Sequence, residues 1–175
     1  MTAAAPAVRI LGIDPGLQVT GYGVLEIRAG RPVVCEAGVV RGTEHERQKL
    51  EMAVRLTNLY NGIVEVIDQY QPKAMAVEQL YAHYEHPRTA ILMGHARGAL
   101  LLAAGQRGIP VTSYNATRIK KTITGHGRAS KDQMQHAMLR ELGLATLPEP
   151  ADVADALAAA LCHYYAIKLV AGNSE

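Results

Sequence analysis

The chain has 175 residues, of which 49% are hydrophobic and 19% are charged, so it is large enough to bury one core as a globular domain. Its start, MTAAAPA, lacks the positive charge and continuous apolar run of a signal peptide, and no segment approaches the roughly 18 apolar residues of a membrane span. The net charge is +2. We expect a cytoplasmic protein without a membrane segment, with a disordered extension at 1–7, one domain at 8–170 and a short tail at 171–175.

Three strands open the predicted fold. Apolar or alternating runs separated by turn residues predict them at Val8–Asp14, Val19–Ile27 and Pro32–Val40. Their short links favour an antiparallel meander. The period changes at Thr43, where TEHE has the spacing of a capping box with Thr43 as N-cap and Glu46 as its partner. A long helix to about Tyr70 is expected from there.

Short strands and helices alternate in the rest of the chain. Their expected positions, in order, are a strand at Ala74–Glu78, a helix at Arg88–Gln106, a strand within GIPVTSY, and helices at Asn115–Ile123, Ser130–Leu142 and Ala151–Leu169. Asn115 is a plausible N-cap, and Ser130 with Gln133 forms a second capping box. Right-handed crossovers place the last two strands parallel to the first. The sequence thus predicts an α/β fold with a five-stranded mixed sheet, three antiparallel then two parallel strands, flanked by helices on both faces.

Four acidic residues stand at the ends of elements that this sheet would bring together. Asp14 ends the first strand and Glu78 ends the fourth, and parallel neighbours place both at the carboxyl edge, where open α/β sheets bind ligands. Asp152 and Asp155 share one face at the start of the last helix. First-turn acids are also common because they favour the helix dipole, and strand-end acids are common in turns and on surfaces. The convergence of all four favours a functional site.

A metal site is the chemistry that such a cluster suits best. A buried carboxylate is costly unless it is paired, protonated or bound to a metal. No Cys or His with ligand spacing accompanies these acids, and oxygen donors alone suit Mg²⁺ or Mn²⁺. Two such ions about 4 Å apart activate water and stabilise a leaving oxygen in phosphodiester hydrolysis.

Five motifs follow one another between Val8 and Lys168: GIDPGLQVTGYGV, AVEQLY, GHARGALLLAA, KKTITGHGRASKDQMQHAM and ADVADALAAALCH. In this order they resemble the RuvC family of bacterial Holliday junction resolvases. The resemblance implies a ribonuclease H-like fold, a homodimer, and paired symmetric nicks in four-way DNA junctions during homologous recombination and DNA repair. It also implies two Mg²⁺ or Mn²⁺ ions and the RuvA–RuvB branch-migration complex as a partner. The catalytic, metal-binding acids of the family fall on Asp14, Glu78, Asp152 and Asp155.

A block of positive charge supplies the expected DNA contacts. From His86 to Lys131 the chain has no Asp or Glu and holds eight of its 18 Lys and Arg residues. Such a block is typical of a surface that faces phosphate, although an ordinary solvated surface fits it equally well. Lys120 and Lys131 resemble catalytically important lysines of the family, and Lys131 is the one we expect in catalysis, at a helix N-terminus. The expected DNA-binding residues are Tyr81, Arg118, Lys120, Lys121, Arg128 and Lys131.

Two of these expected DNA contacts, and the expected subunit interface, have open alternatives. Tyr81 stands where family members often have a Phe that stacks on unpaired bases. Tyr84 competes for that role, and a loop tyrosine packed on the domain surface is a further alternative. Lys121 also fits a merely solubilising role. Gly94 and Gly98, four residues apart, allow close approach of another helix, either in a subunit interface or against the protein's own sheet.

Other functions fit parts of the same pattern. A ribonuclease H that cleaves RNA–DNA hybrids uses the same acids and metals, and fold alone does not decide the substrate. An actin-like nucleotide-binding protein shares the glycine-rich first turn, but it needs a second domain that 175 residues do not provide. A non-catalytic binding protein would not need four intact acids.

Overall fold

The computed structural model describes residues 7–43, 50–80 and 87–172, with side chains to residue 170. The expected contacts of Tyr81 and Tyr84, and most of the two terminal segments, lie outside these residues. In the described residues, five strands form one sheet in the order β3-β2-β1-β4-β5. The strands are β1 (Val8–Asp14), β2 (Val19–Arg28), β3 (Arg31–Arg41), β4 (Ala74–Glu78) and β5 (Val111–Tyr114). Strands β1 to β3 are antiparallel, whereas β4 runs parallel to β1 and β5 parallel to β4, as predicted.

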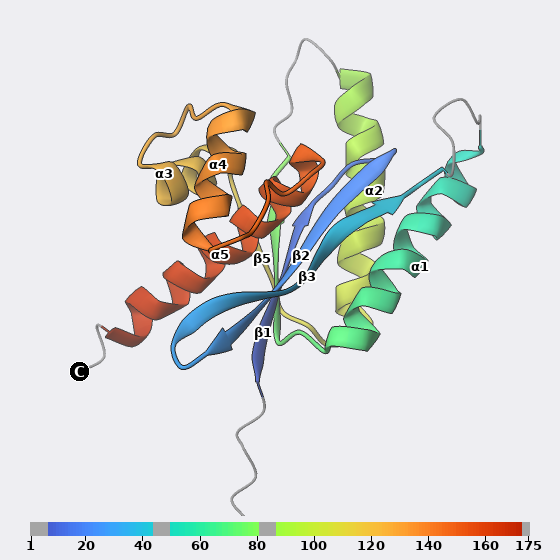
Figure 1. Ribbon diagram of the computed structural model, residues 1–175. Helices are drawn as coiled ribbons and strands as arrows, with labels where there is room; N and C mark the ends of the chain where they lie inside the picture. Colours follow the sequence, from blue (N-terminus) through green and yellow to red (C-terminus); the bar gives the residue numbers. More distant parts are fainter. Residues whose placement is uncertain (1–6, 44–49, 81–86, 173–175) are drawn as a thin grey trace, which may run out of the picture.

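Helices cover both faces of the sheet (Figure 1). Helices α1 (Met52–Tyr70) and α2 (Pro87–Gly105) lie on one face, and α3 (Ala116–Thr124), α4 (Lys131–Glu141) and α5 (Ala151–Gly172) lie on the other. Each face has its own hydrophobic cluster, because alternate residues of the strands point to opposite sides: Leu11 and Ile13 join one cluster, and Ile10 joins the other. The predicted three-layer arrangement is confirmed.

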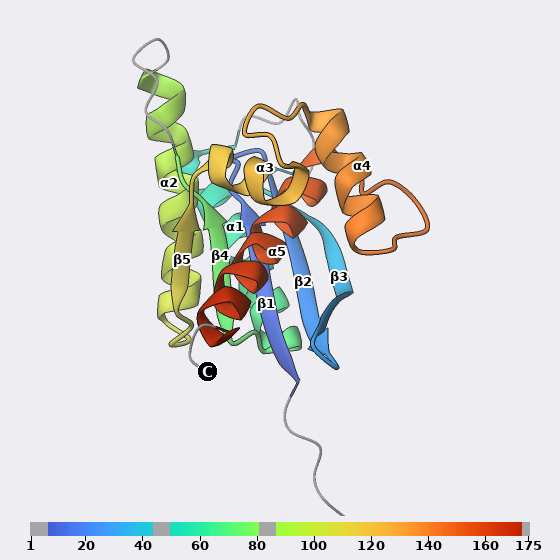
Figure 2. The same ribbon diagram turned by 90° about the vertical axis from the view of Figure 1, so that its left-hand side faces the viewer.

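Helix α5 lies directly across the sheet (Figure 2). Its residues from Val153 to Tyr164 are buried apart from Asp155. The segment Ala151–Val170 is long and apolar enough to cross a membrane by length and composition, which corrects the expectation that no segment approaches this limit. About 61% of it is buried inside the protein, so its apolar character is explained by packing on β1 and β2. It is the central helix of this layer.

The start of α1 differs from the prediction. The helix begins at Met52 after Glu51, whose side chain makes no capping hydrogen bond, and not at Thr43. The chain after β3 is held by other partners, since the Gly42 N–H donates to the Gln18 carbonyl and Asn58 donates to the Gly42 carbonyl. Thr43 is thus not the N-cap of α1. Its expected partner Glu46 lies outside the described residues.

The other two caps are confirmed. The Asn115 side chain accepts from the Arg118 N–H at the start of α3. Ser130 and Gln133 form a complete capping box at the start of α4. These caps fix where α3 and α4 begin, and both helices begin on the side of the sheet where its parallel strands end.

Candidate active site

Glycines bring the start of α5 to the end of β1. A β-carbon on Gly12 would lie 2.0 Å from the carbonyl oxygen of Ala156, and one on Gly21 would lie 2.0 Å from that of Asp152. Any side chain at either position would push the helix off the sheet. Because Asp14 pairs with Gly21 in the β1–β2 ladder, this contact sets the first turn of α5 beside Asp14.

The turn after Asp14 closes on its own chain. The Gly16 N–H donates to Thr20 Oγ1, and that hydroxyl donates to the Gly16 carbonyl at 2.7 Å. A β-carbon on Gly16 would lie 2.1 Å from the Val19 carbonyl oxygen. The glycine is thus explained by this tight turn, which fixes the backbone directly after Asp14.

Glu78 reaches the same edge from β4. In the parallel β1–β4 ladder Ile13 pairs with Val77, so the next residues, Asp14 and Glu78, stand at the same level where both strands end. A pocket of about 620 Å³ opens beside Glu78, between the end of β4, helix α2 and the start of α3. The carboxyl edge therefore combines acidic groups with open space.

The four predicted acids act on one another electrostatically. Burial, and after it the charges of Asp155, Glu78 and Asp152, together raise the pKa of Asp14 to about 8, whereas the charge of Lys131 lowers it. Burial also raises the pKa of Glu78 and of Asp155. In each case the charge of another acid of the set contributes to the rise, so the four carboxylates are close enough to repel one another.

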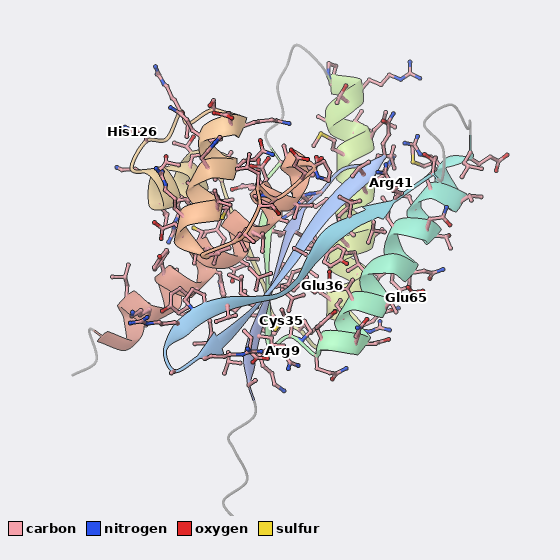
Figure 3. The ribbon with its side chains drawn as sticks, in the orientation of Figure 1. Arg9, Cys35, Glu36, Arg41, Glu65 and His126 are labelled. Carbon is pink, nitrogen blue, oxygen red and sulfur yellow. The ribbon has the colours of Figure 1, made fainter. Side chains whose placement is uncertain are left out.

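A paired buried acid in the same protein behaves in the opposite way. Glu26 accepts from Arg9 at 2.8 Å and from Arg28 at 2.5 Å, and these guanidinium groups lower the pKa of Glu26 to about 2. Figure 3 shows Arg9 near the start of β1, at the other end of the sheet from His126 on the α3–α4 loop. Across residues 7–43, 50–80 and 87–170, none of the four acids at the carboxyl edge has an ion-pair partner within 4.0 Å. These acids lack the compensation that Glu26 has.

Two lysines face the acids from α3 and α4. The charges of Lys120 and Lys131 oppose the rise in pKa of both Glu78 and Asp155. Lys131 is the first residue of α4 and is exposed, and Lys120 is half-buried on α3. The structure thus brings Lys120 and Lys131 of the acid-free block close to the carboxylates.

The donor set fits hard divalent cations, although the side chains are not assembled around one. Within the described part of the chain, no three His, Cys, Asp or Glu side chains are arranged to hold a metal ion. Carboxylates without a cation between them repel one another, so separated side chains are expected in the metal-free protein. The oxygen-only donors and the raised pKa of Asp14 agree with a site that a cation completes.

The remaining basic residues divide into two groups. Lys121 and Arg128 line a pocket of about 610 Å³ with the glycine-rich loop and His126, and both side chains are exposed. The Arg118 guanidinium lies 5.0 Å from the ring centre of Tyr114 and makes a cation–π contact with it. Arg107 is occupied, because it donates two hydrogen bonds to the Asp68 carboxylate at the opposite end of the sheet.

Sequence reasoning missed one arginine beside the site. Arg97 of α2 donates to Ser113 Oγ at 2.6 Å and to the carbonyl oxygen of Glu78 at 3.4 Å. Its only signal in the sequence is a single charge within the apolar run of this helix. It was counted with the general basic block.

Known proteins match the chain over most of its length. The family described as "Crossover junction endodeoxyribonuclease RuvC" matches residues 10–163. The protein of that name from Rhodopirellula baltica is 49% identical over 156 residues, which cover 89% of this chain and 85% of the relative. The solved structure of Thermus thermophilus RuvC matches with a TM-score of 0.79 at 32% identity, over 92% of this chain and 96% of that one. The same protein in complex with a Holliday junction substrate matches with a TM-score of 0.78 at 30% identity and the same coverage. The expected ribonuclease H-like α/β fold is confirmed.

Proposed function

The chain belongs to the RuvC family of crossover junction endodeoxyribonucleases, and we propose that it cuts four-way DNA junctions at the carboxyl edge of its sheet. It is a metal-dependent nuclease of DNA recombination and repair. The proposed catalytic and metal-binding residues are Asp14, Glu78, Asp152 and Asp155. The alternatives of a hybrid-cleaving ribonuclease H and an actin-like nucleotide-binding protein are not favoured, since the relatives that match nearly the whole chain are junction resolvases.

The observation that carries this site is the shared field of the four carboxylates. Burial and the neighbouring acids hold the pKa of Asp14 near 8, and none of the described arginines forms an ion pair with the four acids. Divalent cations are the compensation that such a cluster needs at neutral pH. The four carboxylates would hold two ions, Mg²⁺ or Mn²⁺. When bound, the pair supplies a nucleophile from water and stabilises the departing 3′ oxygen of the cut strand.

The chain's own residues place the DNA strand at this edge. Lys131, at the N-terminus of α4, neutralises a phosphate next to the acids and takes part in catalysis, while Lys120 holds the backbone on the α3 side. Arg118, Lys121 and Arg128 extend the basic surface along α3 and the glycine-rich loop. Tyr81 is the residue proposed to stack on unpaired bases.

A homodimer through α2 would present two such sites to one junction. The glycines of α2 do not pack on the protein's own sheet, because β-carbons on Gly94 and Gly98 would meet no described atom within 4 Å. Ile91 and Leu102 share this face and are 60% and 55% exposed. An apolar stripe with small residues suits a second helix, and a two-fold pair of active sites suits paired nicks.

Three further proposals rest on family membership. The protein would act with the RuvA–RuvB branch-migration complex, and as a DNA-acting enzyme of bacterial type it would work in the cytoplasm. Residues 8–170 would form its one nuclease domain.

Asp14→Asn tests the proposed site. The amide removes one anionic ligand without changing the shape of the side chain, so cleavage of a labelled four-way junction should fall by more than about 100-fold. Junction binding, measured by fluorescence anisotropy without metal, should stay close to that of the wild type. Full cleavage by this variant would rule out the assignment of Asp14.

A further inference from the structure

Arg97 joins the ends of two strands next to the site. It lies on α2 and reaches Ser113 of β5 through Nη2, at 2.6 Å, while its Nε donates to the Glu78 carbonyl oxygen of β4 over a longer 3.4 Å. In the β4–β5 ladder Val77 pairs with Ser113, and the Gln79 N–H donates to the Tyr114 carbonyl at 2.8 Å. The last pair of this ladder is Glu78 with Tyr114, so the guanidinium contacts both strands close to the end of the ladder.

The charge of Arg97 is not used in an ion pair with any acid of the described segments. Its side chain is half-buried, and a rigid planar guanidinium with two fixed acceptors keeps one orientation. Burial and Asp155 raise the pKa of Glu78 and the two lysines lower it, with no contribution from Arg97. Arg97 thus acts on the backbone of Glu78 and not on its carboxylate.

A carboxylate at the end of a strand points where its backbone directs it. The peptide after Glu78 has left the β1–β4 ladder, whose last pair is Ile13 with Val77. Only the β5 side and Arg97 hold it within the described residues. Small displacements of a metal ligand reduce affinity strongly, and loss of a supporting contact costs about 10- to 100-fold.

We propose that Arg97 is a positioning residue that fixes Glu78 for metal binding by tying the ends of β4 and β5 to α2. The proposal rests on the metal site described above and adds to it a residue that touches neither metal nor DNA. Loss of the Arg97 side chain should therefore weaken metal binding and leave junction binding intact.

Arg97→Met tests the proposal, because it keeps an unbranched apolar stem that packs like that of arginine and removes the hydrogen-bond donors. We expect the Mn²⁺ concentration for half-maximal junction cleavage to rise about tenfold. Mn²⁺ binding to the protein alone, followed by electron paramagnetic resonance, should weaken by a similar factor. Arg97→Lys retains one donor toward Ser113 and should recover part of this loss, and Ser113→Ala should reproduce part of it.

Arg107→Met is the matched control. It removes the two hydrogen bonds to Asp68 at the opposite end of the sheet, so it should lower Tm without changing the Mn²⁺ requirement. A lower Tm with an unchanged Mn²⁺ requirement in Arg97→Met would overturn the proposal in favour of a purely structural role. Weaker metal-free junction binding with unchanged Mn²⁺ affinity would overturn it in favour of a phosphate contact. Failure of the wild type to bind Mn²⁺ would instead reject the metal site itself, before any variant is compared.

Discussion

Gly21 of β2 lies directly under Asp152 at the start of α5, so close that a β-carbon on the glycine would stand 2.0 Å from the aspartate's carbonyl oxygen. Gly21 is also the ladder partner of Asp14. One glycine thus sets the distance between an acid on the sheet and the acids on the helix. The spacing of the carboxylates depends on this helix–sheet contact as much as on the acids themselves.

Gly21→Ala should disturb both stability and cleavage. The added methyl must displace the backbone of α5, and overpacking of this kind costs about 1–3 kcal/mol. Thermal melts should show a lower Tm, and junction cleavage should fall more than metal-free junction binding. Gly105→Ala is the control, because a β-carbon there meets no described atom within 4 Å. Equal cleavage by the two variants would show that the contact between Gly21 and α5 does not determine the positions of the acids.

Asp14 should make the metal-free protein less stable as the pH rises. Its pKa is raised from 3.8 to about 8 in the folded state, so between these values the folded protein holds a proton that the unfolded chain has lost. Stability from this group is therefore complete below about pH 4, falls toward pH 8 and is level above it. Asp14→Asn should raise Tm in EDTA at pH 8, and the gain should vanish near pH 4. Glu65→Gln, which removes an exposed carboxylate, is the control. A gain in Tm of equal size at both pH values for Asp14→Asn would contradict the raised pKa of an unpaired Asp14.

Lys131→Ala should affect cleavage far more than folding. The side chain is exposed at the start of α4, so the free energy of unfolding should change by no more than about 0.5 kcal/mol. Loss of a cation beside the reacting phosphate should lower the cleavage rate by about 100-fold. The slope of log junction affinity against log salt concentration should fall by the amount expected for about one lost phosphate contact. An unfolded variant by circular dichroism, or a rate equal to that of Lys121→Ala, would contradict a special role for Lys131.

Gly98→Leu should separate the proposed dimer. Leucine has a higher helix propensity than glycine, so the monomer should gain up to about 1 kcal/mol of stability. The bulky side chain blocks close approach of a second helix at the stripe that also contains Ile91 and Leu102. Light scattering should report a monomer for this variant and a dimer for the wild type. A dimer that persists in Gly98→Leu, as in the exposed control Ala53→Leu on α1, would place the interface elsewhere.

Local patterns predicted most of the fold. Strands β1 and β4 have the predicted bounds, and the caps at Asn115 and Ser130 are confirmed, because these features depend on neighbouring residues. The predicted helix start at Thr43 was wrong, because α1 begins at Met52, whereas the capping box itself lies partly outside the described residues.

The candidate site was only partly readable from the sequence. Strand ends and helix starts indicated the four acids, and resemblance to a family added the lysines. The close packing of α5 on Gly12 and Gly21 could be seen only in the structure, because a glycine in a strand sequence does not reveal what packs on it. Arg97 was missed for a similar reason, as its partners lie 16 and 19 residues away in the chain.

The most direct test of the central claim is strand cleavage of a mobile four-way junction with Mg²⁺ or Mn²⁺, beside a plain duplex and an RNA–DNA hybrid of matched sequence. The site and family together predict paired symmetric nicks in the junction alone, with ligatable 5′-phosphate ends, and no nicks with Asp14→Asn. Cleavage of the hybrid would point to a ribonuclease H. Junction binding without cleavage under either metal would contradict the account and leave the four carboxylates with a structural role.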